Sequence, residues 1–506
     1  MENLTIVFVH GWSVTNVNTY GELPLRLSEE AKRTGLNYEV KEIFLGRYIS
    51  FHDEVRMGDV SKAFHFAVQE QLSDTISNKG RFICVTHSTG GPAIRDWWHR
   101  YYPNPPDACP MSHLIMLAPA NYGSALAQLG KGRIGRLKSW FDDVEPGQGI
   151  LDWLELGSSE AWQLNKDWIV SNGSNINPKG VFPFVLTGQS IDRKFYDHLN
   201  SYTGELGSDG VVRVAAANLE GRYIQLRQPV PVKDAKGNLV SGDLEVARFH
   251  EAPKTPWRII SGKSHSGDSK GILKSVRKAV TNDKSTETIN ALLECIKVKD
   301  DNDYAGLYNQ FAQETTAVQQ QERVEVEDRL LLSDRVFIHD RFSMVIFRVL
   351  DSEGFAVKDF DLLITAGAEN DPDHLPEGFF VDRQRNHISP ETITYYFNYD
   401  IMNGTTPVTG NNGEVIRPAL KGIDSLGLEI HPRPENGFVK YLPCKIKATK
   451  DLFEKALVPN GTTLIEICLQ RVVSKEVFRL DSLGDTMPTK KQGDFKNTRP
   501  GTEVAE

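Results

Sequence analysis

The sequence predicts an α/β domain with a mostly parallel sheet, followed by a smaller domain that is an antiparallel β-sandwich. Over the first 300 residues, short apolar runs alternate with helical patterns, as in a strand at 81–87 followed by a helix at 91–101. This alternation is typical of a parallel sheet with helices on both faces. After about residue 321 the period changes to two, with apolar or aromatic residues at every second position from Ile393 to Ile401, which is typical of a sandwich.

The elements of the first domain follow in order. Residues 59–77 predict a helix, because apolar residues recur there at a spacing of four. Two stretches interrupt the alternation: 137–170 is rich in aromatic and acidic residues, and 221–251 predicts an inserted hairpin with a turn at 234–238. Residues 271–321 are polar and helical. The remaining strand candidates are 5–10, 38–45, 112–120 and 183–189.

These patterns divide the chain into four segments. We expect an α/β domain at 1–300, a helical connector at 301–325 and a β-sandwich at 326–474. The polar tail at 475–506 has few apolar residues, and we expect it to serve as an oligomerisation arm.

Composition excludes several classes of protein. The net charge of −9 comes from intermixed charges, whereas a nucleic-acid-binding protein needs a clustered basic face. The five cysteines are widely spaced and contain no C-x-x-C pair, so neither a disulfide framework nor a zinc site is predicted. No apolar run reaches the ~18 residues of a membrane span, and no signal peptide is recognised before the strand at 5–10. We therefore expect cytoplasmic synthesis and no metal or cofactor.

The strongest local motif is VTHSTGG at 85–91, where a strand leads into a serine, small residues and a helix. This is the pattern of a nucleophile elbow, which lifts a serine hydroxyl clear of the sheet. It predicts Ser88 as a nucleophile and the backbone N–H of Thr89 as a donor to an oxyanion. Thr86 replaces the first glycine of the usual G-x-S-x-G, and an ordinary Ser-Thr-Gly loop after a strand gives the same short motif. Cys84 is a poor nucleophile candidate, because the strand buries it.

A second motif, His-Gly-Trp at 10–12, ends the first strand. Lipases and esterases carry a His-Gly pair there, and the next residue donates a second N–H to the oxyanion. We assign this donor to Trp12, although a strand-ending turn also needs a glycine. The two motifs together predict the α/β-hydrolase fold, with an inserted hairpin and cap elements.

A serine nucleophile of this fold needs an acid and then a histidine, in that order along the chain. Asp209 in GSDG at 207–210 and His265 in SHS at 264–266 lie in loops beside predicted strands. The alternative interpretations of these residues are a turn-forming aspartate and a surface-loop histidine. His250 lies inside the predicted hairpin strand. The competing candidates for these two roles are Asp192, Asp197, His198 and His250.

Half of the eight tryptophans fall within 137–170, just after a basic stretch. Tryptophan suits an acyl pocket or a bilayer interface, and basic side chains meet lipid phosphates. A cap subdomain with its own small core and a solvated basic flank is an equally good interpretation. The candidates for contact with substrate or membrane are Trp140, Trp153, Lys131 and Arg133.

The motifs VHGWSVT at 9–15, NTYG at 18–21 and THSTGG at 86–91 resemble the PlaB-type bacterial phospholipases A/lysophospholipases A. Thr86 matches that family's variant of the elbow. The resemblance covers the catalytic half by motifs and the second half by architecture. It implies hydrolysis of phospholipid and lysophospholipid acyl esters by Ser88, Asp209 and His265, association with a membrane surface of the bacterial envelope, and a homodimer or homotetramer.

Two other functions fit the same residues. A carboxylesterase or an acyltransferase forms the same acyl-enzyme, so the elbow does not distinguish them. A non-catalytic lipid- or protein-binding module could keep the fold. The presence of serine, acid, base and oxyanion glycine in the required order favours an enzyme.

Overall fold

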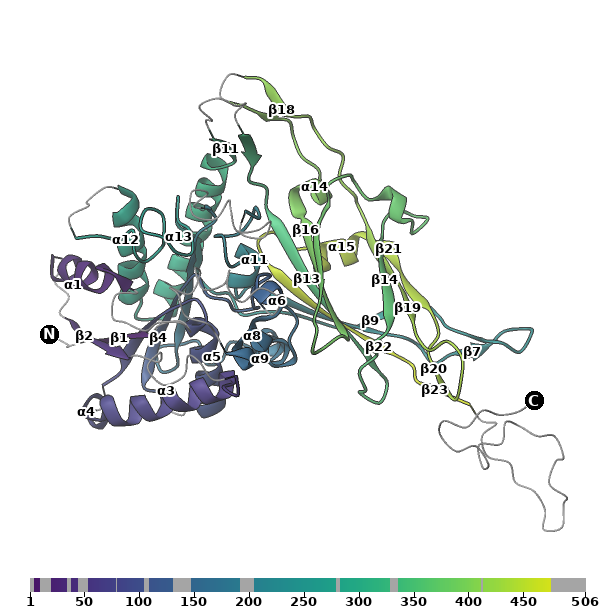
Figure 1. The fold of residues 1–506 in the computed structure, drawn as a ribbon, viewed down its shortest axis with the longest axis horizontal. Helices are drawn as coiled ribbons and strands as arrows, with labels where there is room; N and C mark the ends of the chain where they lie inside the picture. The colour runs from purple at the N-terminus through teal and green to yellow at the C-terminus, as the bar shows by residue number, and fades with distance from the viewer. Residues whose placement is uncertain are drawn as a thin grey trace, which may run out of the picture.

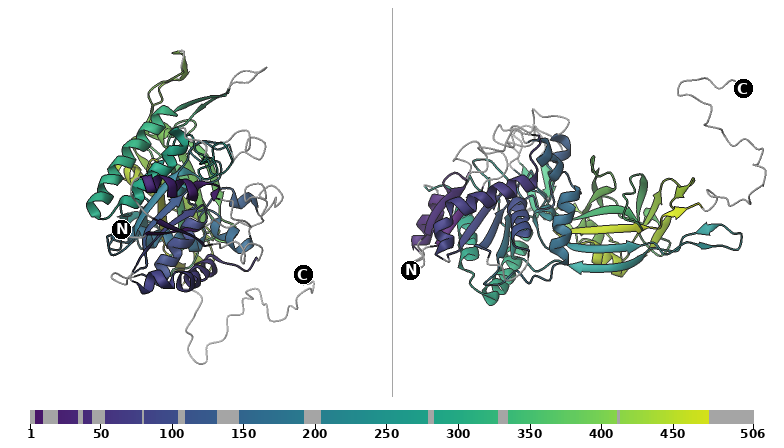
Figure 2. Two further views of the ribbon diagram at one scale, coloured as in Figure 1. Left: turned by 90° about the vertical axis from the view of Figure 1, so that its left-hand side faces the viewer. Right: turned by 90° about the horizontal axis from the view of Figure 1, so that it is seen from below.

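The computed structural model describes two halves that lie end to end, an α/β half that carries the N-terminus and a β-rich half (Figure 1; Figure 2, right). The predicted tail at 475–506 lies outside the described residues. No helix in the described part of the chain is both long and apolar enough to cross a membrane. The structure describes residues 4–9, 20–33, 38–43, 53–78, 80–103, 109–130, 147–191, 204–278, 283–327, 335–410 and 413–474.

The α/β half is built on a sheet of six strands, in the order β10-β5-β4-β3-β1-β2. Every neighbouring pair in it is parallel, which confirms the predicted α/β fold. Strand β3, which leads to Ser88, lies between β1 and β4 in the interior of the sheet. The strands are β1 (Leu4–Val9), β2 (Tyr38–Ile43), β3 (Phe82–His87), β4 (Met111–Leu117), β5 (Phe182–Thr187) and β10 (Trp257–Ile259).

Helices bury both faces of this sheet. On β1, Ile6 and Phe8 belong to one apolar core and Val7 and Val9 to another, because successive side chains of a strand point to opposite faces. Burial on both faces explains why these strands are continuous apolar runs in the sequence. One core includes residues of α1 (Leu23–Arg33), α12 (Asp283–Lys297) and α13 (Asp301–Gln321); the other includes residues of α3 (Met57–Gln71), α5 (Gly90–Tyr101), α8 (Gln148–Leu154) and α9 (Ser159–Val170).

The β-rich half consists of two facing sheets with an apolar core between them, as expected for a sandwich. The larger sheet is mixed rather than antiparallel, because β22 pairs in parallel with both β13 and β6. Its order is β15 (Phe380–Arg385), β16 (Thr392–Asn398), β13 (Phe342–Asp351), β22 (Thr462–Leu469), β6 (Arg222–Arg227) and β9 (Glu245–Glu251). The smaller sheet is β14 (Phe360–Thr365), β19 (Leu426–Pro432) and β21 (Cys444–Thr449).

Two predicted domain boundaries differ from the structure. The hairpin at 221–251 does not belong to the α/β domain, since β6 and β9 complete the large sheet of the β-rich half. The predicted connector at 301–325 is not a linker either. Its helix α13 buries Leu307 and Phe311 in a core of the α/β half.

Short elements complete the described chain. In the α/β half these are α4 (Ser73–Ser77), α6 (Ala127–Gly130) and α11 (Val214–Ala217). The others are β7 (Val232–Lys233), β8 (Leu239–Val240), β11 (Val324–Glu327), β12 (Arg335–Ile338), the 3₁₀ helix η2 (Pro372–His374), α14 (Tyr399–Asn403), β17 (Val408–Thr409), β18 (Val415–Arg417), β20 (Val439–Lys440), α15 (Lys450–Ala456) and β23 (Val472–Val473).

Candidate active site

Ser88 occupies a sharp turn between β3 and α5. Its φ of 54° is in the left-handed region, which is costly for a residue with a Cβ atom and is often found at functional sites. Neighbouring backbone holds the turn: the Ser88 N–H donates to Leu117 O at 3.0 Å, and Ser88 O accepts from the N–H groups of Gly91 and Ala120. The C-terminal end of β4 and the start of α5 therefore stabilise the strained turn that follows β3.

Small residues after the serine let the helix approach the sheet closely. A Cβ atom on Gly91 would lie 2.6 Å from Cβ of Pro119, so a larger residue would displace the start of α5. Thr86 is fully buried at the first glycine position of the usual motif, and its hydroxyl has no hydrogen-bond partner among the residues that the structure describes. The turn thus forms without a glycine there.

The structure brings Asp209 and His265 to Ser88. His265 Nε2 lies 3.1 Å from Ser88 Oγ, and His265 Nδ1 lies 2.9 Å from Asp209 Oδ2. Asp209 is fully buried, and its second oxygen accepts from the backbone N–H groups of Val211 at 3.0 Å and Val212 at 2.7 Å. The backbone N–H of His265 also donates to the backbone carbonyl oxygen of Asp209 at 2.9 Å. With both carboxylate oxygens engaged, Asp209 can hold the imidazole in one orientation and one tautomer.

The structure describes two of the alternative candidates for the catalytic residues, His250 and Cys84, and neither fits the role. His250 is on β9 of the β-rich half, opposite Tyr223 of β6. Cys84 is fully buried on β3, and burial raises the pKa of its thiol well above the ordinary value; a thiol that stays protonated is a poor nucleophile. The other three competitors, Asp192, Asp197 and His198, lie outside the described residues.

Of the two candidate oxyanion donors, Thr89 and Trp12, the structure describes only Thr89. Thr89 immediately follows the nucleophile and precedes the first residue of α5, where the helix dipole favours negative charge. We therefore expect its backbone N–H to donate to an oxyanion formed at Ser88. Trp12 lies outside the described residues.

The expectation that Trp153 contacts lipid is wrong. Its side chain is 3% exposed, and it belongs to the apolar core shared by α3, α5 and α8. Trp162 on α9 is buried in the same core. A buried ring cannot reach a bilayer, so these tryptophans have a structural role. The core that they fill is shared with α3 and α5 and is not a separate core of a cap subdomain. The other three candidates, Lys131, Arg133 and Trp140, lie outside the described residues.

His87 is a residue of the site that the sequence interpretation missed. Its ring centroid lies 4.8 Å from that of His265, and its Nε2 lies 3.3 Å from His265 O. Because a carbonyl oxygen only accepts, Nε2 must carry the proton and donate. His87 thus supports the loop that presents His265. The only sequence indication was its position directly before the nucleophile.

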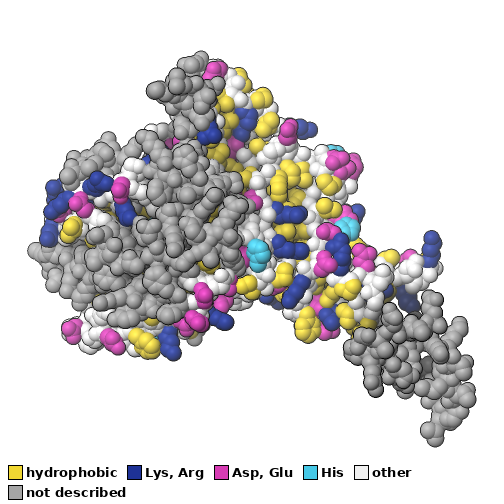
Figure 3. All heavy atoms as spheres, viewed as in Figure 1, with side chains coloured by type: hydrophobic (Ala, Val, Ile, Leu, Met, Phe, Trp, Pro, Cys, Tyr) yellow, Lys and Arg dark blue, Asp and Glu magenta, His cyan; other side chains and the backbone are white. Residues whose placement is uncertain are grey.

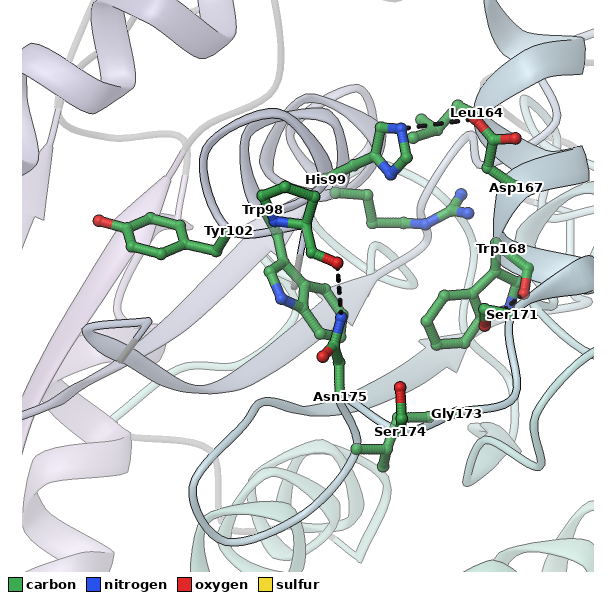
Figure 4. Close-up of a pocket in the computed structure, with 13 residues that line it drawn as sticks. Trp98, His99, Tyr102, Leu164, Asp167, Trp168, Ser171, Gly173, Ser174 and Asn175 are labelled. Carbon is green, nitrogen blue, oxygen red and sulfur yellow. Dashed lines mark hydrogen bonds and ion pairs between the residues drawn. The ribbon is translucent and has the colours of Figure 1, made fainter. Parts of the chain in front are cut away.

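A cavity of about 190 Å³ lies at the other end of α5, among side chains of α5, α9 and the loop after α9 (Figure 4). Trp98 and Trp168 face it, and His99 Nε2 lies 3.4 Å from Asp167 Oδ2. Ser88 precedes the first turn of this 12-residue helix, which spans about 18 Å. The cavity is therefore separate from the site around Ser88.

Two solved structures are similar to the chain over almost its whole length. Phospholipase PlaB from Legionella pneumophila is 41% identical, with a TM-score of 0.83 over 97% of this chain and 98% of that chain. Phospholipase PlaB from Legionella pneumophila in complex with thio-NAD is 40% identical, with a TM-score of 0.81 over 96% of this chain and 98% of that chain. No protein-family model and no curated protein matches the sequence.

Proposed function

Since this chain belongs to the PlaB phospholipase family, we propose that it hydrolyses acyl esters of membrane glycerophospholipids and lysophospholipids. One observation carries the assignment of residues: the hydrogen-bonded series from Ser88 Oγ through His265 to Asp209. A serine, an imidazole and a buried carboxylate in this order are what acyl transfer requires.

In the acylation step, His265 Nε2 accepts the proton of Ser88 while Oγ attacks the ester carbonyl. The tetrahedral oxyanion receives the backbone N–H of Thr89 and, in our assignment, that of Trp12. When the carbon–oxygen bond to the glycerol breaks, His265 returns the proton to the leaving alcohol, and the acyl group remains on Ser88. Asp209 stabilises the transient imidazolium throughout.

In the deacylation step, water takes the place of the alcohol. His265 Nε2 accepts a proton from the water as its oxygen attacks the acyl carbonyl, and the same N–H groups hold the second oxyanion. Collapse breaks the bond to Ser88 Oγ, which recovers its proton from His265. The products are a free fatty acid and the unmodified enzyme.

We place this reaction at a phospholipid surface of the bacterial envelope, because the substrate resides there. On the face drawn in Figure 3, basic, acidic and apolar side chains are intermixed over the β-rich half, so attraction to anionic lipid has to be local. Lys131, Arg133 and Trp140 remain the candidates for this contact. Charge reversal of Lys131 and Arg133 should reduce sedimentation with anionic liposomes; unchanged sedimentation would remove them from the contact.

We also propose a homodimer or homotetramer, with the tail at 475–506 exchanged between subunits. The hairpin of β7 and β8 supports association, because it projects from the β-rich half (Figure 1) and leaves Val230 73% and Val232 62% exposed. Light scattering on a chain truncated before Lys475 tests the idea. A particle of unchanged subunit number and activity would refute the role of the tail.

The test of the function compares micellar phospholipid with a short soluble ester, each with and without an added alcohol. We expect a higher kcat/KM on the phospholipid, free fatty acid as the product, and neither reaction with Ser88→Ala. A preference for the short ester would favour the carboxylesterase alternative. Transfer of the acyl group to the alcohol would favour an acyltransferase, and equal activity of Ser88→Ala would remove the proposal.

A further inference from the structure

Asp209 lies in a short hairpin-like loop, 205–213, here called the acid loop. Two backbone hydrogen bonds join its two sides: Asp209 N–H donates to Val212 O at 3.1 Å, and Val214 N–H donates to Gly207 O at 2.8 Å. The position of the Asp209 carboxylate therefore depends on how this loop is held against the rest of the molecule.

An ion pair closes the base of the acid loop. Arg213 is 2% exposed, and its Nε and Nη2 donate to the two carboxylate oxygens of Glu205, both at 2.8 Å. A forked pair of this kind fixes geometry as well as charge. Arg213 Nη2 also donates at 2.5 Å to Asp382 Oδ2, and Asp382 belongs to β15 of the β-rich half.

Two further side chains of the large sheet support the same loop. Tyr396 on β16 is directly opposite Asp382 in the register, so both project from one face of the sheet. The Arg213 guanidinium lies 4.1 Å from the centroid of the Tyr396 ring, and the Tyr396 hydroxyl donates to Gly207 O at 3.2 Å. Phe342 on β13 stacks on that ring at 5.0 Å. A Cβ atom on Gly207 would overlap the Phe342 ring and the Tyr396 hydroxyl, so the loop and the sheet are in direct contact.

We propose that Asp382 and Tyr396 are positioning residues for Asp209: the β-rich half holds the catalytic acid in place from outside the catalytic domain. This inference rests on the proposed function. Ser88 and His265 follow strands of the central sheet, whereas the acid loop bridges the two halves. Removing Asp382 or the Tyr396 hydroxyl should leave Ser88 and His265 in place and let Asp209 shift.

The experiment measures kcat and KM on a short soluble ester for Asp382→Ala, Asp382→Asn and Tyr396→Phe. A misplacement of about 1 Å can cost about 10²-fold in rate, so we expect Asp382→Ala to lose about 10- to 100-fold in kcat with KM nearly unchanged. Asp382→Asn keeps an acceptor for Arg213 and should recover most of this loss. Tyr396→Phe removes a single oxygen, should fold normally, and should lose roughly 5- to 10-fold by the same argument.

The matched control is Asp351→Ala. Asp351 is also a buried carboxylate of the large sheet, at the opposite end of β13 from Phe342, and binds Arg471 at 2.7 Å and Tyr441 at 3.0 Å. We expect this variant to lower the unfolding midpoint and to keep kcat. If Asp382→Ala and Tyr396→Phe lose no more kcat than Asp351→Ala, the contact is only structural and the proposal fails.

A second measurement asks whether the effect passes through Asp209. In an Asp209→Asn background, Asp382→Ala should cause no further loss of the rate at which a fluorophosphonate labels the protein, because residues that act as a unit are not additive. Equal losses in both backgrounds would overturn the proposal. Failure of the proposed function is distinguishable from this outcome. A protein without a serine-hydrolase site would not be labelled at Ser88 in its wild-type form, and a carboxylesterase or acyltransferase would be labelled but would show no preference for micellar phospholipid over the short ester.

Discussion

Replacing Gly207 by alanine tests the contact between the acid loop and the β-rich half. Gly207 has a φ of 73°, and a left-handed conformation costs a residue with a Cβ atom about 1–2 kcal/mol. The new Cβ would lie closer than 3.0 Å to Phe342 Cδ2 and Tyr396 Oη, and overpacking of this kind costs about 1–3 kcal/mol. The free energy of unfolding should therefore fall by about 2–5 kcal/mol.

Gly237→Ala is the matched control for this substitution. Gly237 has a φ of 83°, and no atom lies within 4 Å of a Cβ built on it, so the variant has the conformational cost alone. Urea unfolding followed by fluorescence, together with kcat on a short ester, separates the two effects. Gly207→Ala should be less stable than Gly237→Ala and should lose at least about tenfold in kcat, while Gly237→Ala keeps wild-type kcat. Equal stability and equal kcat of the two variants would refute the reasoning.

Three further predictions follow from buried groups and from the proposed triad. Trp153→Ala removes a buried indole and should destabilise the protein by about 3–5 kcal/mol. Its rates of hydrolysis of soluble ester and of phospholipid should fall equally; a loss confined to liposome binding would show that Trp153 contacts lipid after all. Burial lowers the pKa of His113 to about 4, so between an unfolded pKa of about 6.5 and pH 4 the unfolded state binds more protons and stability falls as the pH falls. His113→Asn should flatten this dependence of the urea midpoint, and an unchanged slope would contradict the cause. Asp209→Asn and His265→Asn should each lose at least about 10³-fold in kcat while staying folded; if His250→Asn is inactive and His265→Asn is not, the base is reassigned.

The central sheet could be predicted from the sequence because its strands are buried on both faces. All six residues of β3 are buried, and such a strand is a continuous apolar run that a local interpretation detects. The same holds for β5. The triad residues were detectable for a related reason, since the fold places them in loops beside those strands and in a fixed chain order.

Pairings between distant segments could not be predicted in this way. Strand β6 pairs with β22, more than two hundred residues later in the chain, and nothing in the local sequence of either strand identifies its partner. The helix α13 is polar overall. Only the face that carries Leu307 and Phe311 indicates that this helix packs on the sheet. The hairpin at 221–251 and its turn were predicted correctly, but the sheet that this hairpin joins was not. A connector was predicted where the structure has a packed helix.

The contacts that hold the acid loop in place could not be predicted from the sequence either. The Arg213–Asp382 ion pair joins residues 169 positions apart, and its charges look like ordinary surface charges in the sequence. Trp153 illustrates the opposite error, because an aromatic-rich stretch has the same composition whether its rings face lipid or a core. Burial, which only the fold determines, decides between these interpretations.

The central claim is that Ser88 is the nucleophile of a phospholipid acyl hydrolase. The most direct measurement is mass spectrometry of the full-length protein after reaction with a fluorophosphonate, with peptide mapping of the adduct and hydrolysis of micellar phospholipid measured in parallel. We predict one adduct per chain, located on Ser88, together with complete loss of phospholipid hydrolysis, and no adduct on Ser88→Ala. An adduct on another residue, or phospholipid hydrolysis that persists after Ser88 is fully labelled, would contradict the claim.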